Sequence, residues 1–138
     1  MPGRPAPSRR ALLKTAAVTP VAGAGLAACS PGKQAEGPTG PVELGAESEV
    51  APGSSKLYRD QNVVVSRDAG GTLTAYSTIC THAGCAISKL DGTTLTCFCH
   101  GSEFDATNGK VLQAPASVPL KKLSVQVKNG RIVASPEA

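Results

Sequence analysis

The side chains most able to bind a metal are gathered in one short window of this 138-residue chain. The window runs from Cys80 to Ser102 and contains both histidines and four of the five cysteines. Each half supplies a thiol and an imidazole close together, plus one further cysteine: Cys80, His82 and Cys85, then Cys97, Cys99 and His100. Thiolates and imidazoles are ligands for zinc and for iron–sulfur clusters. The window therefore predicts a metal site, unless its cysteines only form crosslinks.

Three uses of these six side chains are chemically reasonable. A structural zinc site takes four ligands, commonly from paired Cys-x-x-Cys knuckles. The Cys97-Phe98-Cys99 stretch is too tight for such a knuckle, and two cysteines would be left over. A scaffold made only of disulfides leaves both histidines without a role. A [2Fe–2S] cluster held by two cysteines and two histidines, with a disulfide between the remaining cysteines, uses every group.

The chain around this window has the pattern of antiparallel β-structure. Residues 72–79 alternate apolar and polar side chains with a period of two and lead directly into Cys80. Three turn pairs separate short apolar runs and predict hairpins: Asp91-Gly92, Asn108-Gly109 and Asn129-Gly130. The first hairpin would bring the two halves of the window side by side. No segment of useful length has a helical period, so we expect an all-β fold, a small antiparallel barrel or sandwich.

The first 28 residues have the composition of an export signal. They contain the twin arginine Arg9-Arg10 within a stretch that resembles the Tat signature, followed by a short, Ala-rich apolar run. The run ends in Leu26-Ala27-Ala28-Cys29, which resembles a lipoprotein processing box, so we expect cleavage before Cys29 and lipidation of that residue. An uncleaved membrane anchor is the alternative, although the run is shorter than the ~20 residues that a span needs.

The formal charge of +4 belongs to this leader. From Cys29 onward ten basic residues meet ten acidic ones, so the body has no basic footprint for nucleic acid. The stretch that follows Cys29 is rich in glycine and proline, which predicts a flexible linker. The expected organisation is a Tat-type lipoprotein signal over 1–28, the lipidated cysteine and linker over 29–41, and a folded domain over 42–138.

The two halves of the window resemble the paired motifs of the Rieske [2Fe–2S] proteins. The matching stretches are Cys80-Thr81-His82-Ala83-Gly84-Cys85 and Cys97-Phe98-Cys99-His100-Gly101-Ser102. Their extra cysteines are similar to those of the disulfide-containing members found in cytochrome bc complexes. The likeness extends from about Val42 to Ser135 and includes a proline loop at Ala114-Pro115-Ala116. It implies a Rieske-type domain with one [2Fe–2S] cluster per chain.

The resemblance also implies a role for each residue of the window. Cys80 and Cys97 would hold the inner iron, and His82 and His100 the outer iron. Cys85 and Cys99 would form a disulfide between the two cluster-binding loops. Gly84 and Gly101 would allow backbone to approach the cluster closely, and the Ser102 hydroxyl would donate to a bridging sulfide.

Two positions depart from the family pattern. Phe104 stands where high-potential members carry a tyrosine whose hydroxyl binds a cysteine ligand, so we expect a lower reduction potential. Ala83 replaces a bulky leucine that is common in quinol-oxidising members, which weakens the expectation that quinol docks at the histidines. Phe98, inside the second motif, is expected to cover the cluster or fill the core.

These features predict an electron carrier that is lipid-anchored at the extracytoplasmic face of the membrane. Its partners would be a quinol- or substrate-oxidising donor and a cytochrome-like acceptor. No catalytic residues are visible, because both histidines are already committed to the window. One alternative is the iron–sulfur subunit of a quinol–cytochrome c reductase-like or arsenite oxidase-like complex. Others are the ferredoxin of a ring-hydroxylating oxygenase and a non-redox lipoprotein braced by disulfides or zinc.

Overall fold

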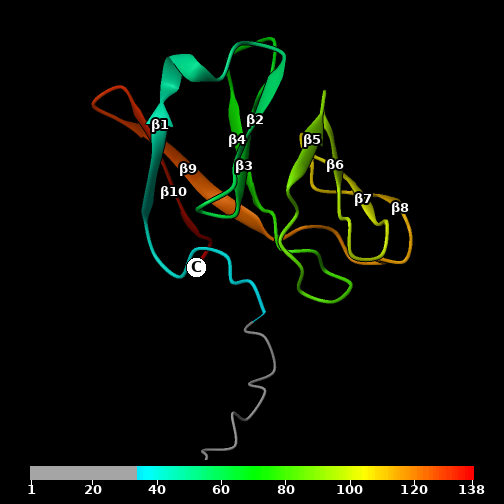
Figure 1. The fold of residues 1–138 in the computed structure, drawn as a ribbon. Coiled ribbons are helices and arrows are strands. Elements are labelled where there is room, and N and C mark those ends of the chain that lie inside the picture. Colours follow the sequence, from blue (N-terminus) through cyan, green and yellow to red (C-terminus); the bar gives the residue numbers. More distant parts are fainter. Residues whose placement is uncertain (1–33) are drawn as a thin grey trace, which may run out of the picture. The chain divides into compact units, whose positions relative to one another are not determined.

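The computed structural model describes residues 34–138, so the predicted signal at 1–28 and Cys29 lie outside the described residues. The described chain forms ten β-strands and one turn of 3-10 helix at Glu47–Glu49 (Figure 1). The strands are β1 (Val42–Ala46), β2 (Ser54–Tyr58), β3 (Val63–Arg67), β4 (Leu73–Ser77), β5 (Lys89–Asp91), β6 (Thr94–Thr96), β7 (Glu103–Asp105), β8 (Val111–Gln113), β9 (Lys122–Lys128) and β10 (Arg131–Pro136). Within residues 34–138 no helix is long and apolar enough to cross a membrane.

The strands form two antiparallel sheets, which confirms the predicted all-β fold. The larger sheet has the order β1-β10-β9-β4-β3-β2, and the smaller sheet has the order β5-β6-β7-β8. The three predicted turn pairs lie in the hairpins β5–β6, β7–β8 and β9–β10. Asn129 and Gly130 both have positive φ, at 51° and 75°, as the tight β9–β10 turn requires.

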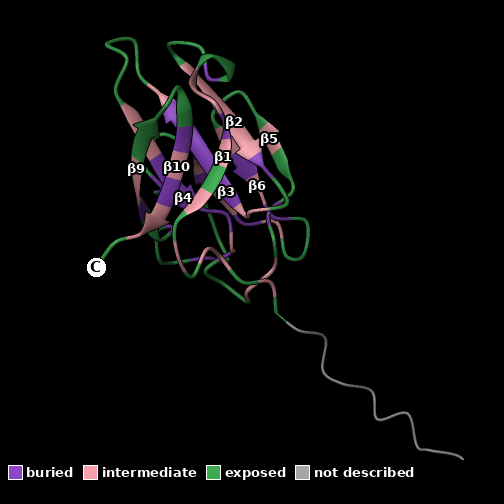
Figure 2. Cartoon of the chain, turned by 90° about the vertical axis from the view of Figure 1, so that its left-hand side faces the viewer, coloured by how far each residue is buried: buried purple, intermediate pink, exposed green. Residues whose placement is uncertain are grey.

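The alternation of side chains along β3 divides the buried apolar residues into two clusters. Val63 and Val65 pack with residues of β4, β9 and β10, whereas Val64 points to the opposite face. There Val64 joins a second cluster that contains Phe104, Cys80 and Cys97. Figure 2 shows buried residues along the strand interiors and exposed residues at the loop tips. The predicted ligand cysteines are therefore part of a hydrophobic core.

The segment just before β1 lies against the domain. Asn62 Nδ2 donates a hydrogen bond of 3.0 Å to the Glu36 carbonyl. Gly37 approaches Ser77 so closely that a Cβ atom there would lie 2.5 Å from Ser77 Oγ. The described part of the predicted linker, residues 34–41, thus contacts the turn before β3 through Asn62 and the end of β4 through Ser77.

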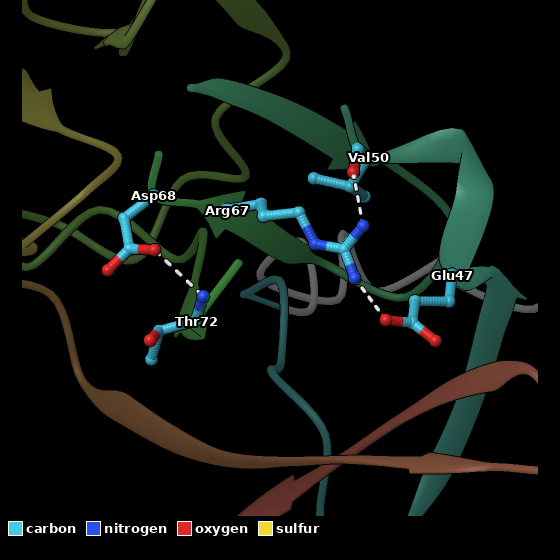
Figure 3. A network of polar contacts seen from close by, with 5 residues as sticks. All are labelled: Glu47, Val50, Arg67, Asp68 and Thr72. Atoms are coloured by element: carbon cyan, nitrogen blue, oxygen red, sulfur yellow. Dashed lines mark hydrogen bonds and ion pairs between the residues drawn. The ribbon is translucent and has the colours of Figure 1, made fainter. Parts of the chain in front are cut away.

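A half-buried ion pair connects the 3-10 turn to β3. Arg67, whose side chain is 16% exposed, pairs with Glu47 and also donates to the Val50 carbonyl at 3.4 Å (Figure 3). Its Nε atom is buried and has no partner among residues 34–138. On the neighbouring turn, Asp68 accepts a 2.8 Å hydrogen bond from the Thr72 amide. The Arg67 charge therefore depends on Glu47 for most of its compensation.

Replacing Glu47 by glutamine is expected to lower the free energy of unfolding by about 1–2 kcal/mol. The pair lies between the exposed and buried extremes, and its loss leaves a guanidinium partly desolvated without its counter-charge. Urea denaturation of both proteins measures the change. The matched control is Glu137→Gln, because Glu137 pairs with Lys122 at the surface. A control that loses as much stability as Glu47→Gln would contradict the argument.

Candidate metal centre

Two loops with the same backbone hydrogen-bond pattern carry the predicted ligands. The first, residues 80–85, precedes β5, and the second, residues 97–102, joins β6 to β7. In each loop the first residue donates to the sixth, as Cys80 does to the Cys85 carbonyl at 2.8 Å and Cys97 to the Ser102 carbonyl at 2.9 Å. The β5–β6 hairpin lies between the loops in sequence, so it places both at one end of the smaller sheet (Figure 1).

A glycine closes each loop at its fifth position. Gly84 donates to the Cys80 carbonyl and Gly101 to the Cys97 carbonyl, both at 2.9 Å. Their φ angles are 76° and 81°, in the left-handed region that other residues rarely adopt. The equivalent position in both loops therefore requires glycine for conformational reasons.

The predicted disulfide is present and joins the two loops. Cys85 and Cys99 are bonded with an S–S distance of 2.11 Å and a Cα–Cα distance of 6.6 Å. The sulfur atoms of Cys85, Cys97 and Cys99 lie within 4.8 Å of one another. Two of these three are bonded to each other, so only Cys97 in this group can act as a thiolate ligand.

Two free thiols lie on the inner side of the loops. Cys80 is 3% exposed and Cys97 is 1% exposed. Burial raises the pKa of the Cys97 thiol, and the neighbouring Cys80 thiol raises it further, while backbone hydrogen bonds from Cys99 and His100 oppose the shift. A thiolate in such a site needs a cation for compensation. The two thiols therefore fit a site where a metal binds.

The two imidazoles lie together on the outer side. His82 and His100 are both exposed, and their ring centroids are 4.7 Å apart with an interplanar angle of 80°. Two buried thiols and two clustered, exposed imidazoles in the same pair of loops provide four nitrogen and sulfur donors from four residues. This donor set fits a [2Fe–2S] cluster of mixed ligation.

Ser102 and Phe104 follow the second loop and are both fully buried. Ser102 Oγ accepts a 3.0 Å hydrogen bond from the Ala116 amide. Among the hydrogen bonds of the described residues, its own hydroxyl proton has no acceptor, so it remains available to a bound group. Phe104 packs in the same core cluster as Cys80 and Cys97 and has no polar atom to offer.

The proline loop at 114–119 also contacts the two cluster loops, and its hydrogen bonds to them were not predicted from the sequence. Thr81 Oγ1 donates to the Val118 carbonyl at 2.6 Å, across 37 residues of sequence. Ser102 accepts from Ala116 in the same loop. Neither contact has a local sequence signal, because each depends on where the chain returns after β8.

The three loops contain no carboxylate, ammonium or guanidinium side chain. Residues 79–87, 97–102 and 112–120 contain no aspartate, glutamate, lysine or arginine. Phe98 is 70% exposed and Val118 is 57% exposed. Phe98 therefore does not fill the core, because its side chain lies at the surface of the second loop. The other expectation, that it covers the cluster, stays a prediction.

The comparisons with known proteins agree with this geometry. The Rieske [2Fe-2S] domain model matches residues 40–124. The cytochrome b6-f complex iron-sulfur subunit of Chlorobaculum tepidum is 38% identical over 97 residues, which make up 68% of this chain and 52% of that protein. Sulredoxin of Sulfurisphaera tokodaii is 34% identical over 89 residues, covering 57% of this chain and 82% of that protein.

A solved Rieske structure is also similar to this chain. The cyanobacterial plasma membrane Rieske protein from Synechocystis matches with a TM-score of 0.51 and 31% identity, over 67% of this chain and 97% of that chain. The chain spans about half the length of the two Chlorobaculum cytochrome b6-f subunits it matches.

Proposed function

Because the chain belongs to the Rieske [2Fe–2S] domain family, we propose that it is a membrane-tethered electron carrier outside the cytoplasm, transferring one electron at a time. A single observation carries the redox part of this proposal. Two free, buried thiols and two exposed imidazoles meet in a pair of loops that a disulfide joins.

The four donors divide into an inner and an outer pair. Cys80 and Cys97 would bind the inner iron, where the core excludes water, and His82 and His100 would bind the outer iron at the surface. When bound, the cluster stores one electron, with a net charge of 0 when oxidised and −1 when reduced. Neutral imidazoles in place of two thiolates raise the potential above that of all-cysteine clusters, into a range of roughly −150 to +300 mV.

The exposed histidines provide the shortest route for an electron to leave the domain. The three loops around them contain no Asp, Glu, Lys or Arg, and Phe98 and Val118 add apolar surface. Glu36 and Lys121 lie at the edge of these loops, where they line a pocket with Cys80 and Thr81. Such loops fit a partner that docks by apolar contact and hydrogen bonds rather than by opposite charge. The donor would be a quinol- or substrate-oxidising protein and the acceptor a cytochrome-like one.

A second candidate is the iron–sulfur subunit of a larger oxidoreductase complex. The matching relatives named as cytochrome b6-f subunits favour it, as does a relative named as a putative nitrate reductase Rieske subunit. Co-purification of a large subunit with the tagged chain would support this reading. Isolation of the chain alone from solubilised membranes would support the free carrier.

Export and anchoring rest on the leader sequence. A Tat signal would carry the domain across the membrane after folding, and lipidation of Cys29 would then retain it at the outer face. Cell fractionation and intact-mass measurement of the mature protein test this part. A soluble protein that keeps residues 1–28 would contradict it.

The redox part is tested by electron paramagnetic resonance of the reduced full chain with a potentiometric titration. A rhombic mixed-ligand [2Fe–2S] signal that titrates as one electron, with two irons per chain, is the expected result. A colourless protein with stoichiometric zinc, or with no metal, would overturn it.

Phe104→Tyr is expected to raise the midpoint potential. Phe104 is fully buried in the same part of the hydrophobic core as Cys80 and Cys97, so a tyrosine hydroxyl there would lie among the ligand cysteines. A hydrogen bond to sulfur that strengthens by ~1–2 kcal/mol on reduction corresponds to roughly 45–90 mV, at 59 mV per tenfold change. Protein-film voltammetry measures the shift. Phe98→Tyr is the control, because that ring points to solvent, and an unchanged or lowered potential in Phe104→Tyr would refute the idea.

A further inference from the structure

The second cluster loop is held by a side chain that belongs to neither motif. Gln113, the last residue of β8, donates from Nε2 to the Gly101 carbonyl at 2.8 Å. Gly101 connects His100 to Ser102, the two residues of this loop proposed to reach the outer iron and a sulfide. The Gln113 amide therefore contacts the backbone carbonyl of the residue that lies between them in sequence.

With this contact, the two cluster loops and the proline loop are each connected to the other two. The disulfide joins the first loop to the second, and Thr81 joins the first to the proline loop through the Val118 carbonyl. The second loop is joined to the proline loop and its preceding strand by the Ala116–Ser102 bond and by Gln113. Each pair of loops is thus connected by at least one contact.

Gly101 is the point in the second loop where an external tie has the most effect. Its φ of 81° lies in the left-handed region, which glycine adopts far more readily than other residues because it has no Cβ atom. Nothing else is bonded to its carbonyl among the hydrogen bonds of residues 34–138. The donor from Gln113 therefore restrains the orientation of the Gly101–Ser102 peptide, one bond pair beyond His100.

We propose that Gln113 is a positioning residue for the cluster, acting through the Gly101 carbonyl to hold His100 and Ser102 in place. The inference rests on the proposed function, because it assigns His100 as a ligand. It requires an N–H donor at position 113, not a particular charge. A donor of either neutral or positive character should serve, and an acceptor should not.

Three substitutions of Gln113 distinguish the effect of a hydrogen-bond donor from the effect of side-chain charge. Gln113→Leu removes the donor, Gln113→Glu replaces it with an acceptor, and Gln113→Lys restores a donor with the opposite charge to glutamate. Gln126→Leu is the matched control, since Gln126 is exposed on β9 and makes no side-chain hydrogen bond among the described residues. All four are compared with the wild-type holoprotein, with circular dichroism to establish that each is folded.

Amide exchange reports on the loop, and two further measurements report on the cluster. Hydrogen–deuterium exchange is measured on peptides covering 97–102, with 80–85 as the internal reference. The two cluster measurements are the rate at which the visible absorbance decays in excess chelator and the width of the resonance signal. Loss of one hydrogen bond at an exposed site predicts about five-fold faster exchange and cluster loss.

The expected result is that Gln113→Leu and Gln113→Glu accelerate exchange in 97–102 but not in 80–85, lose the cluster faster and broaden the signal. Gln113→Lys and the Gln126 control should resemble wild type. The proposal would be overturned if Gln113→Glu and Gln113→Lys changed the exchange and cluster-loss rates in opposite directions while Gln113→Leu left them unchanged, because that pattern shows an effect of charge. A Leu variant that matches wild type, or a Lys variant as impaired as Leu, would also overturn it.

Failure of the proposed function gives a different result. A wild-type protein without a mixed-ligand signal would refute the redox assignment, and exchange in 97–102 would still show whether Gln113 holds the loop.

Discussion

Cys97→Ser is expected to abolish the [2Fe–2S] cluster, reducing bound iron from two atoms per chain to near zero. Cys97 is 1% exposed and lies in the hydrophobic core with Cys80. A serine hydroxyl keeps its proton at neutral pH, so it cannot supply the negative charge of a thiolate to the inner iron. Iron analysis, visible absorbance and the resonance signal of the reduced protein measure the loss.

The matched control is Cys29→Ser. Cys29 is the remaining cysteine outside the window and is the one we expect to be lipidated. The same substitution there should leave iron content and spectrum unchanged while releasing the protein from the membrane fraction. Wild-type iron in Cys97→Ser would refute the ligand assignment, and membrane-bound Cys29→Ser would refute only the anchor.

The double variant Cys85→Ala/Cys99→Ala is expected to retain its β-sheets but to lose the cluster at least ten-fold faster than wild type. The disulfide joins residues 14 positions apart and links the two cluster loops covalently. A crosslink that closes a loop of about 15 residues stabilises by roughly 3 kcal/mol in the chain-entropy model. Its loss therefore favours states in which the two loops separate and expose the iron.

The proline loop should limit this damage, because Thr81 and Ser102 still connect each cluster loop to it. Decay of the visible absorbance in chelator gives the rates. Dithiothreitol provides an independent check, since it should accelerate decay in wild type and have no effect on the double variant. A variant that keeps its cluster as long as wild type would contradict the bracing role of the disulfide.

Much of the fold was predictable because its signals are local. The Asn129-Gly130 turn requires two residues that tolerate positive φ, and that requirement is visible in two adjacent letters. Alternation through residues 73–77 identifies β4 before any partner strand is known. Position within the sheets was not predictable, because pairing of β4 with β9 joins segments more than forty residues apart.

Some features of the metal centre were likewise predictable from the sequence and others were not. Cysteine and histidine side chains can bind metals wherever they occur, so the sequence alone identified the candidate donors and the two loop motifs. The Cys85–Cys99 pairing followed from the resemblance to the Rieske family. Only the tertiary structure decided which groups surround those donors. The Thr81–Val118 bond spans 37 residues, the docking of Glu36 on Asn62 spans 26, and Phe98 turned outward instead of inward. These features depend on how distant segments meet, and a single hydrogen bond of this kind leaves no periodic pattern in the chain.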